Sequence, residues 1–128
     1  MPQQPLPIPG PITRLGRLIH PADANVHGTL FGGEAMRFMD EAAGVAAVRY
    51  ARGSVVTAHV DAIDFRAPVP IGAFLEASAQ VVAVGRTSMT VDVVLEAEDR
   101  HTAARTVTTT GRFILVAVDA EGRPREVR

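Results

Sequence analysis

The sequence has 128 residues, about one domain's length, and its 47% hydrophobic and 21% charged residues exclude wholesale disorder. Its formal net charge of −1 disfavours a protein whose main task is to bind nucleic-acid phosphates. All thirteen basic residues are arginine and there is no cysteine, which excludes lysine Schiff bases, P-loop lysines, thiolate nucleophiles, disulfides and cysteine-ligated zinc.

Other features narrow the class of protein further. The four histidines are scattered without metal-ligand spacing, so we expect no metal. No apolar run reaches the roughly 18 residues of a membrane-spanning helix, and the start lacks the pattern of a secretory signal. We therefore expect a soluble cytoplasmic protein with no membrane or nucleic-acid partner.

The chain begins with a proline-rich stretch. Residues 1–11 hold five of the nine prolines, and we expect them to be loose or extended, because proline cannot donate to a hydrogen-bond ladder. Residues 12–128 then form one domain. Within it, apolar and polar residues alternate weakly over residues 12–20, which predicts a short strand. Residues 21–33 are rich in Gly, Asp and Asn, which predicts a loop.

One helix is predicted over residues 34–52, which are rich in alanine and free of proline. The middle of this helix is unusually small, with Ala42, Ala43, Gly44, Ala46 and Ala47. Small side chains allow close approach to another layer, so we expect the helix to be buried.

Four strands follow, over residues 55–65, 74–84, 87–99 and 104–118. Two of them alternate clearly, with Leu75, Ala77, Ala79, Val81 and Ala83 on one face of the first and Met89, Val91, Val93, Leu95 and Ala97 on one face of the second. The short connections predict antiparallel pairing, so the fold class is α+β with one helix on an antiparallel sheet. A single helix cannot cover a five-stranded sheet, and the uncovered edges predict an oligomer.

Asp40 is the first candidate catalytic residue. Its helical spacing places it on the same face as Ala43, Gly44 and Ala47, the face expected to meet the sheet. A poorly hydrated carboxylate there would be a better base near neutrality. The alternative is a structural role, in which a backbone amide or an arginine satisfies Asp40, and both interpretations stay open.

Gly32 and Gly33 precede the predicted helix, where backbone N–H groups are unpaired at the positive end of the helix dipole. Such donors suit an oxyanion that develops on a carbonyl, although a plain glycine N-cap is the simpler explanation. Gly33 and Asp40 are seven residues apart, about 10 Å along a helix, so donor and acid can address one bound carbonyl group from different directions.

Three weaker candidates remain. Asn25 lies in the loop before the glycines, where it either makes a turn or orients a water or a carbonyl, and His27 beside it is most simply a surface residue. Ser88 lacks the surroundings of a nucleophile elbow. The connection made by Gly85, Arg86, Thr87 and Ser88 offers donors adequate for a phosphate.

Taken together, these segments resemble hotdog-fold acyl-CoA thioesterases of the short-chain, cytosolic acyl-CoA hydrolase type. The resemblance runs in order through PADANVHGTLFGGEAMRFMDEAA, VVTAHVDAIDFRAPVPIG, VGRTSMTVDVVLEAED and TGRFILVAVDAEGRPR, from about residue 15 to residue 125. It implies a long central helix wrapped by a five- to six-stranded antiparallel sheet, and sites between two subunits of a homo-oligomer, at least a dimer and commonly a trimer of dimers.

The resemblance also implies residue roles. Asp40 would be the general base or nucleophile, Gly33 the oxyanion-hole amide, and Asn25 of the facing subunit a holder of water or carbonyl. Substrate contacts would come from Gly32, Val56, Thr57, Arg66, Gly85, Arg86, Thr87 and Ser88. Coenzyme A would be part of the acyl-CoA substrate, with no separate cofactor.

One departure from the family concerns the lysines that often hold the nucleotide phosphates. This chain has none, so Arg66, Arg86 or Arg112 must substitute. Two alternative functions are a hotdog dehydratase or hydratase that uses His27 with Asp40, and a sensor that binds acyl-CoA without turnover.

Overall fold

A computed structural model describes residues 3–6 and 9–127, which contain one long helix and six strands. The strands are β1 (Gln4–Pro5), β2 (Thr13–Leu18), β3 (Val55–Phe65), β4 (Phe74–Val84), β5 (Ser88–Glu98) and β6 (Arg105–Ala117). Helix α1 (Gly32–Ala51) follows a short 3₁₀ helix, η1 (Pro21–Asp23). The predicted α+β architecture with antiparallel strands is confirmed, and β3 and β4 have the predicted bounds.

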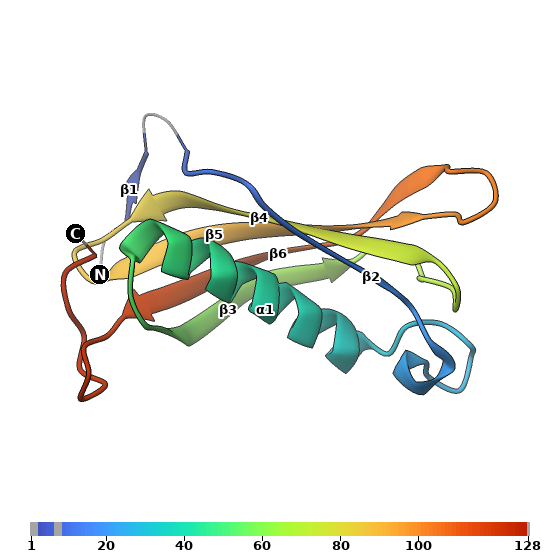
Figure 1. Ribbon diagram of the computed structural model, residues 1–128, viewed down its shortest axis with the longest axis horizontal. Coiled ribbons are helices and arrows are strands. Elements are labelled where there is room, and N and C mark those ends of the chain that lie inside the picture. Colours follow the sequence, from blue (N-terminus) through green and yellow to red (C-terminus); the bar gives the residue numbers. More distant parts are fainter. Residues whose placement is uncertain (1–2, 7–8, 128) are drawn as a thin grey trace.

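The sheet has two different edges. Its strand order is β1-β4-β5-β6-β3, and β2 also pairs with β4. Strand β4 is long enough to pair with β2 over residues 74–79 and with β1 over residues 83–84. The β4 edge is therefore covered, whereas β3 forms the opposite edge with an unpaired side (Figure 1).

The described part of the proline-rich segment is bound to the sheet. Gln4 and Pro5 pair with Val84 and Ala83, and the amides of Leu6 and Gly10 donate to carbonyls of β4 at 3.0 Å. The expectation for this segment was loose or extended chain, and Gln4 and Pro5 are extended. They are bound to β4 because non-proline residues between the prolines keep their N–H donors. Residues 1, 2, 7 and 8 lie outside the described residues.

Helix α1 begins two residues earlier than predicted. Gly32 and Gly33 form its first turn, and the amides of Glu34 and Ala35 both donate to the Phe31 carbonyl. Glycine has a low helix propensity. The first turn of a helix nevertheless accommodates it, because the N–H groups there lack intrahelical acceptors whichever residue is present. No helix within residues 3–6 and 9–127 is long and apolar enough to cross a membrane.

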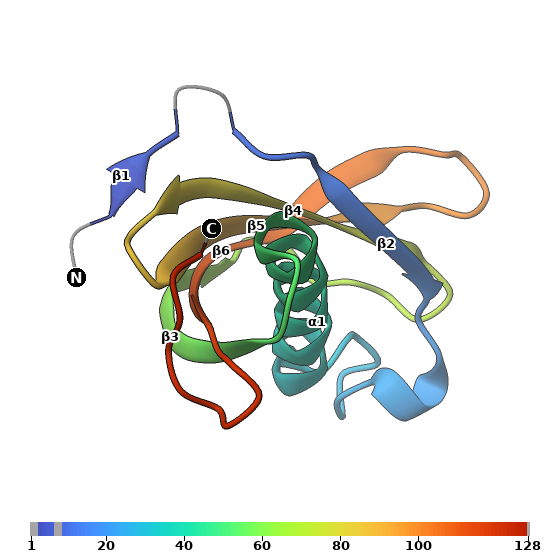
Figure 2. The same ribbon diagram turned by 60° about the vertical axis from the view of Figure 1, so that its left-hand side comes forward.

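The core lies between α1 and the concave face of the sheet, which curves around the helix (Figure 2). As predicted, the alanines in the middle of α1 are buried: Ala42, Ala43, Ala46 and Ala47 are at most 4% exposed. The opposing sheet residues are the predicted alternating ones, among them Leu75, Ala77, Val91, Val93 and Leu95. Because the side chains on this face of α1 are small, the helix can pack close to the sheet.

Strand β3 differs from the other long strands in its exposure. Nine of its eleven residues are exposed. Its pairing with β6 is irregular, with register shifts between Thr57 and His59 and between Asp61 and Asp64, and Ala62 has a φ of 51°. One edge of the protein is thus open and sits directly beside α1.

Candidate active site

Three of the predicted site residues line one hollow between α1 and β3. The hollow has a volume of about 360 Å³ and is lined by Gly33, Met36, Arg37 and Asp40 of α1, Thr57 and Val60 of β3, and Phe113 of β6. The hollow therefore combines two kinds of group. Its polar groups can react or bind an oxyanion, and its apolar side chains can hold a hydrocarbon.

The carboxylate of Asp40 is held by one hydrogen bond. Thr57 Oγ1 donates to Asp40 Oδ1 over 2.6 Å. No described residue hydrogen-bonds to the other oxygen, Oδ2. Thr57 fixes the orientation of the carboxylate, and Oδ2 is left to act on a water or a substrate.

The Gly33 amide supplies the second polar group. Gly33 is the second residue of α1, so its N–H points out of the helix end, and no described residue accepts a hydrogen bond from it. A Cβ at Gly33 would lie only 2.7 Å from the Phe31 ring. Glycine at this position keeps the amide accessible while Phe31 packs beside it.

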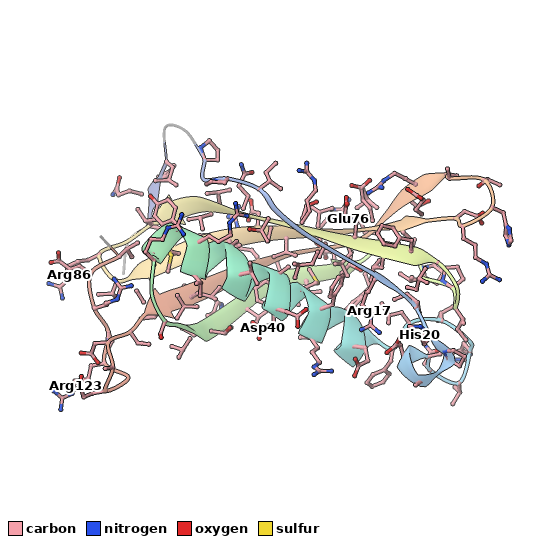
Figure 3. The ribbon with its side chains drawn as sticks, viewed as in Figure 1. Arg17, His20, Asp40, Glu76, Arg86 and Arg123 are labelled. Carbon is pink, nitrogen blue, oxygen red and sulfur yellow. The ribbon has the colours of Figure 1, made fainter. Side chains whose placement is uncertain are left out.

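The structure corrects the expected burial of Asp40. Ala43 and Ala47 are fully buried, but Asp40 is exposed to solvent. Asp40 lies at the margin of the buried face of α1, on the side of β3, and beyond β3 the described chain supplies no further strand. Figure 3 shows Asp40 near the middle of α1, away from either end of the molecule.

Asn25 is used to close its own loop. Its Oδ1 accepts from the amides of His27 and Thr29 at 2.9 and 3.2 Å, and its Nδ2 donates to Thr29 Oγ1 at 3.1 Å. The same chain's Asn25 and His27 are absent from the residues that line the hollow at Asp40. The structure of one chain thus does not bring His27 to Asp40, as a dehydratase pair would require.

A second hollow lies where the N-terminus of α1 meets the Phe65 end of β3. It has a volume of about 350 Å³, and its lining includes the predicted residues Gly32 and Arg66 together with Leu30, Phe65 and Thr109. The Arg66 side chain is exposed and has no carboxylate partner within the described ranges. An unpaired guanidinium beside an apolar hollow can bind a phosphate or carboxylate.

The remaining predicted residues lie elsewhere in the chain. Val56 pairs with Val116 and points to the sheet face opposite to its neighbour Thr57. Arg86 stands at one end of the molecule, far from Asp40 (Figure 3), with Gly85, Thr87 and the buried Ser88. Within one chain these residues are not part of either hollow.

Arg112 is already paired. Its Nε and one Nη donate to the two carboxylate oxygens of Asp92 at 2.7 and 3.1 Å, and this contact raises the pKa of Arg112. A guanidinium engaged in this way is a poor choice to hold a substrate phosphate. In the part of the chain that is described, no group of three His, Asp or Glu residues is arranged to hold a metal ion.

The loop before α1 is braced by Asp23. The pKa of Asp23 is lowered, mainly because its carboxylate accepts the His20 amide at 2.9 Å, and also because Arg17 lies 2.7 Å away. The Asp23 carbonyl accepts the amide of Phe31, the residue that caps α1. These contacts fix the residue at which the helix begins, and therefore the position of the Gly33 amide.

Sequence reasoning did not find the apolar walls of the first hollow. Met36 fits the helical spacing of Asp40, since it lies one turn earlier. Val60 and Phe113 depend on how β3 and β6 pair, which no local pattern predicts.

Comparison with known proteins identifies the family. A model of the thioesterase superfamily matches residues 27–104. An uncharacterised acyl-CoA thioester hydrolase of Zymomonas mobilis is 42% identical over 107 residues, which are 84% of this chain and 72% of that protein. The chain belongs to the thioesterase superfamily.

Solved structures agree with this membership. A hexameric acyl-CoA thioesterase, crystallised in its apo form, superposes with a TM-score of 0.87 at 39% identity, over 90% of this chain and 74% of that one. The acyl-CoA hydrolase from Staphylococcus aureus, in complex with butyryl coenzyme A and coenzyme A, has a TM-score of 0.85 at 34% identity, over 90% and 70% of the two chains. The predicted hotdog fold of this superfamily member is confirmed.

Three further structures of the Staphylococcus aureus hydrolase carry alanine in place of one asparagine, one aspartate or one threonine. These three residues follow one another at the same spacing as Asn25, Asp40 and Thr57 in the present chain.

Proposed function

We propose that this protein hydrolyses acyl-CoA thioesters to a free carboxylic acid and coenzyme A, in the hollow that Gly33, Asp40 and Thr57 line. One observation carries the proposal: the Asp40 carboxylate and the Gly33 amide line the same hollow. One carboxylate oxygen is held by Thr57 and the other is free, and the amide at the N-terminus of α1 has no acceptor among the described residues. Membership of the thioesterase superfamily and the names of the similar proteins support it.

The reaction needs only a base and an oxyanion donor, because a thioester is already activated. Asp40 Oδ2 takes a proton from water, and the resulting hydroxide attacks the thioester carbonyl carbon. The negative charge that develops on the carbonyl oxygen is stabilised by the Gly33 amide and the helix dipole. The tetrahedral intermediate then expels the coenzyme A thiolate, which takes the proton held on Asp40 Oδ2 and so restores the carboxylate.

The spacing along α1 favours the base role over direct attack by Asp40. Seven residues of helix separate Gly33 from Asp40, about 10 Å along the axis. The Asp40 side chain leans towards the N-terminus of the helix, as helical side chains do, and this shortens the distance to the Gly33 amide. The gap that remains between carboxylate and amide is still larger than one carbonyl group. A water between carboxylate and carbonyl fills this gap, with the free N–H of the facing subunit's Asn25 as a further donor.

We also propose that the working protein is a homo-oligomer built through β3. An exposed eleven-residue edge is an open template for another strand, and β4, on the other side, is already covered by β1 and β2. A second copy of the chain, paired antiparallel with β3, would close the edge and cover the exposed Asp40. The hexameric neighbour supports an assembly of three such dimers.

Such a dimer would combine residues that lie apart in one chain. Antiparallel pairing about a two-fold axis sets the Val55 end of β3 against the Phe65 end of the partner. Because Val56, Val116 and Ser88 share one row of the sheet, the connection at residues 85–88 lies at the Val55 end. The partner's Arg86 would thus approach Arg66 and Gly32, which leaves Arg66 and Arg86 as the arginines that hold the coenzyme A phosphates.

The test is thiol release from a panel of straight-chain acyl-CoAs, with crotonyl-CoA hydration followed in parallel. The proposal expects one thiol released per acid formed and no hydration of the crotonyl double bond. Hydration without thiol release would instead favour the dehydratase reading, and tight binding without either reaction the sensor reading. A cytoplasmic location remains a prediction.

A further inference from the structure

The hollow that holds Asp40 ends on an aromatic ring. Met36 and Val60 form its apolar walls, and Phe113 of β6 is the one lining residue that belongs to a strand interior to the sheet. Phe113 is 1% exposed, so almost all of its surface is packed against other residues. A hydrocarbon that enters past Asp40 therefore meets the ring of Phe113.

The register of the sheet explains why the ring stands there. Val60, Phe113 and Val91 lie opposite one another on β3, β6 and β5, so all three side chains point to the concave face, towards α1. Thr57 lies in the next row of the same face, opposite Leu115. The reacting groups and the ring are thus about one row of side chains apart.

The space behind the ring is already filled. Gly111, two residues before Phe113, faces the same way and has no side chain, yet a Cβ built there would lie 2.9 Å from Met39 Cε and 3.1 Å from Ile63 Cγ1. Met39 is fully buried. Met39 and Ile63 occupy the room that the glycine leaves, so a hydrocarbon cannot pass the ring of Phe113 on the Gly111 side.

We infer that Phe113 sets the length of the acyl group that the site accepts, with Met39 as a second stop behind it. This inference rests on the proposed thioesterase function. The hollow of about 360 Å³ holds roughly a dozen groups at the ~30 Å³ of a water-sized group.

This geometry predicts the shape of the specificity profile. Each methylene that becomes buried raises kcat/KM roughly fourfold. Once the chain reaches Phe113, a further methylene has to displace side chains packed at interior density, which do not yield. The profile therefore rises with chain length and then falls.

The experiment measures kcat/KM for even-numbered acyl-CoAs from two to sixteen carbons with the wild type, Phe113→Leu, Phe113→Ala and the control Leu115→Ala. Leu115 is also 1% exposed and lies on the same strand and face, but it does not line the hollow. We expect the optimum to move by about two carbons in Phe113→Leu and by about four in Phe113→Ala. The optimum of Leu115→Ala stays where it is in the wild type.

The outcomes separate the two proposals. An unchanged optimum in a folded Phe113 variant, or an equal shift in Leu115→Ala, would overturn the inference while the proposed function stands. A wild type that releases no thiol from any member of the panel would overturn both. Phe113→Leu removes little volume and decides the question if Phe113→Ala does not fold.

Discussion

Asp40 shows how one hydrogen bond can define a reactive carboxylate. Thr57 donates to Oδ1 over 2.6 Å, and this bond fixes the rotation of the carboxylate about its axis. The other oxygen has no hydrogen-bond partner among the described residues, and Asp40 lines the hollow between α1 and β3. If Asp40 acts as a base, Thr57 is a positioning residue whose hydroxyl matters for the rate and not for binding.

Replacement of Thr57 tests this role. We expect Thr57→Val to lower kcat roughly ten- to a hundredfold with little change in KM, because a hydrogen bond to a charged group contributes about 1.5–3 kcal/mol. Thr57→Ser keeps the hydroxyl and should retain most of the activity. Steady-state kinetics on one acyl-CoA measure both variants, and a Thr57→Val variant that keeps the wild-type kcat, or a loss in Thr57→Ser as large as that in Thr57→Val, would contradict this role of the hydroxyl.

At this scale the sequence predicted part of the candidate site, namely the residues that share one helix. Helical spacing relates Gly33 to Asp40 because both lie on one continuous helix. It cannot relate Asp40 to Thr57 or Phe113, since those contacts depend on how distant strands pair. The predicted burial of Asp40 failed for a related reason: the spacing identifies the face of a helix but not where the sheet beneath it ends.

The loop and helix that present Gly33 are stabilised by an acid with a pKa below its usual range. Asp23 accepts the His20 amide and the Arg17 guanidinium, and its backbone carbonyl binds the helix cap. A carboxyl whose pKa is lowered by folding stabilises the folded state above its unfolded pKa of about 3.9. That stabilisation is lost as the pH falls through the lower pKa of the folded state.

Asp23→Asn should therefore lower the free energy of unfolding near neutral pH. The difference in this free energy between the variant and the wild type should shrink below about pH 4. Urea unfolding at a series of pH values between 3 and 7 measures this. His20→Gln, which removes an imidazole whose Nδ1 is 3.8 Å from the same carboxylate but keeps the backbone amide, serves as the control. A difference that stays constant down to pH 3 would contradict the brace.

Most elements followed from local patterns. Strands β3, β4 and β5 were predicted within a residue of their bounds, because alternation and turn residues coincide there. The start of α1 was missed by two residues, since low helix propensity does not prevent glycine from occupying a first turn. Strand β1 was missed because proline content does not reveal the donors between the prolines.

At the scale of the whole molecule, the uncovered edge was predicted from the mismatch between one helix and a broad sheet. The sequence could not predict which strand forms that edge, because the order β1-β4-β5-β6-β3 places β3 beside β6, although β4 and β5 come between them in the chain. Strand order depends on long-range packing and leaves no local signal.

Ala58 offers a direct test of the proposed β3 interface. The register shift between Thr57 and His59 leaves Ala58 without a partner on β6, and proline is tolerated at bulges of edge strands. Ala58→Pro should therefore fold but pair poorly with a second copy, and activity should fall in proportion to the assembled fraction. Light scattering coupled to gel filtration, with Ala58→Ser as the control, measures the assembly; a fully assembled and active Ala58→Pro would exclude this interface.

The most direct test of the whole account is the rate of thiol release from butyryl-CoA by Asp40→Asn, measured in the same assembly state as the wild type. Asparagine preserves the shape and the acceptor for Thr57 but removes the base, whose contribution is typically a hundred- to ten-thousandfold. We predict a loss of kcat of at least about a hundredfold with KM nearly unchanged. A variant that retains kcat within about twofold of the wild type would contradict the account.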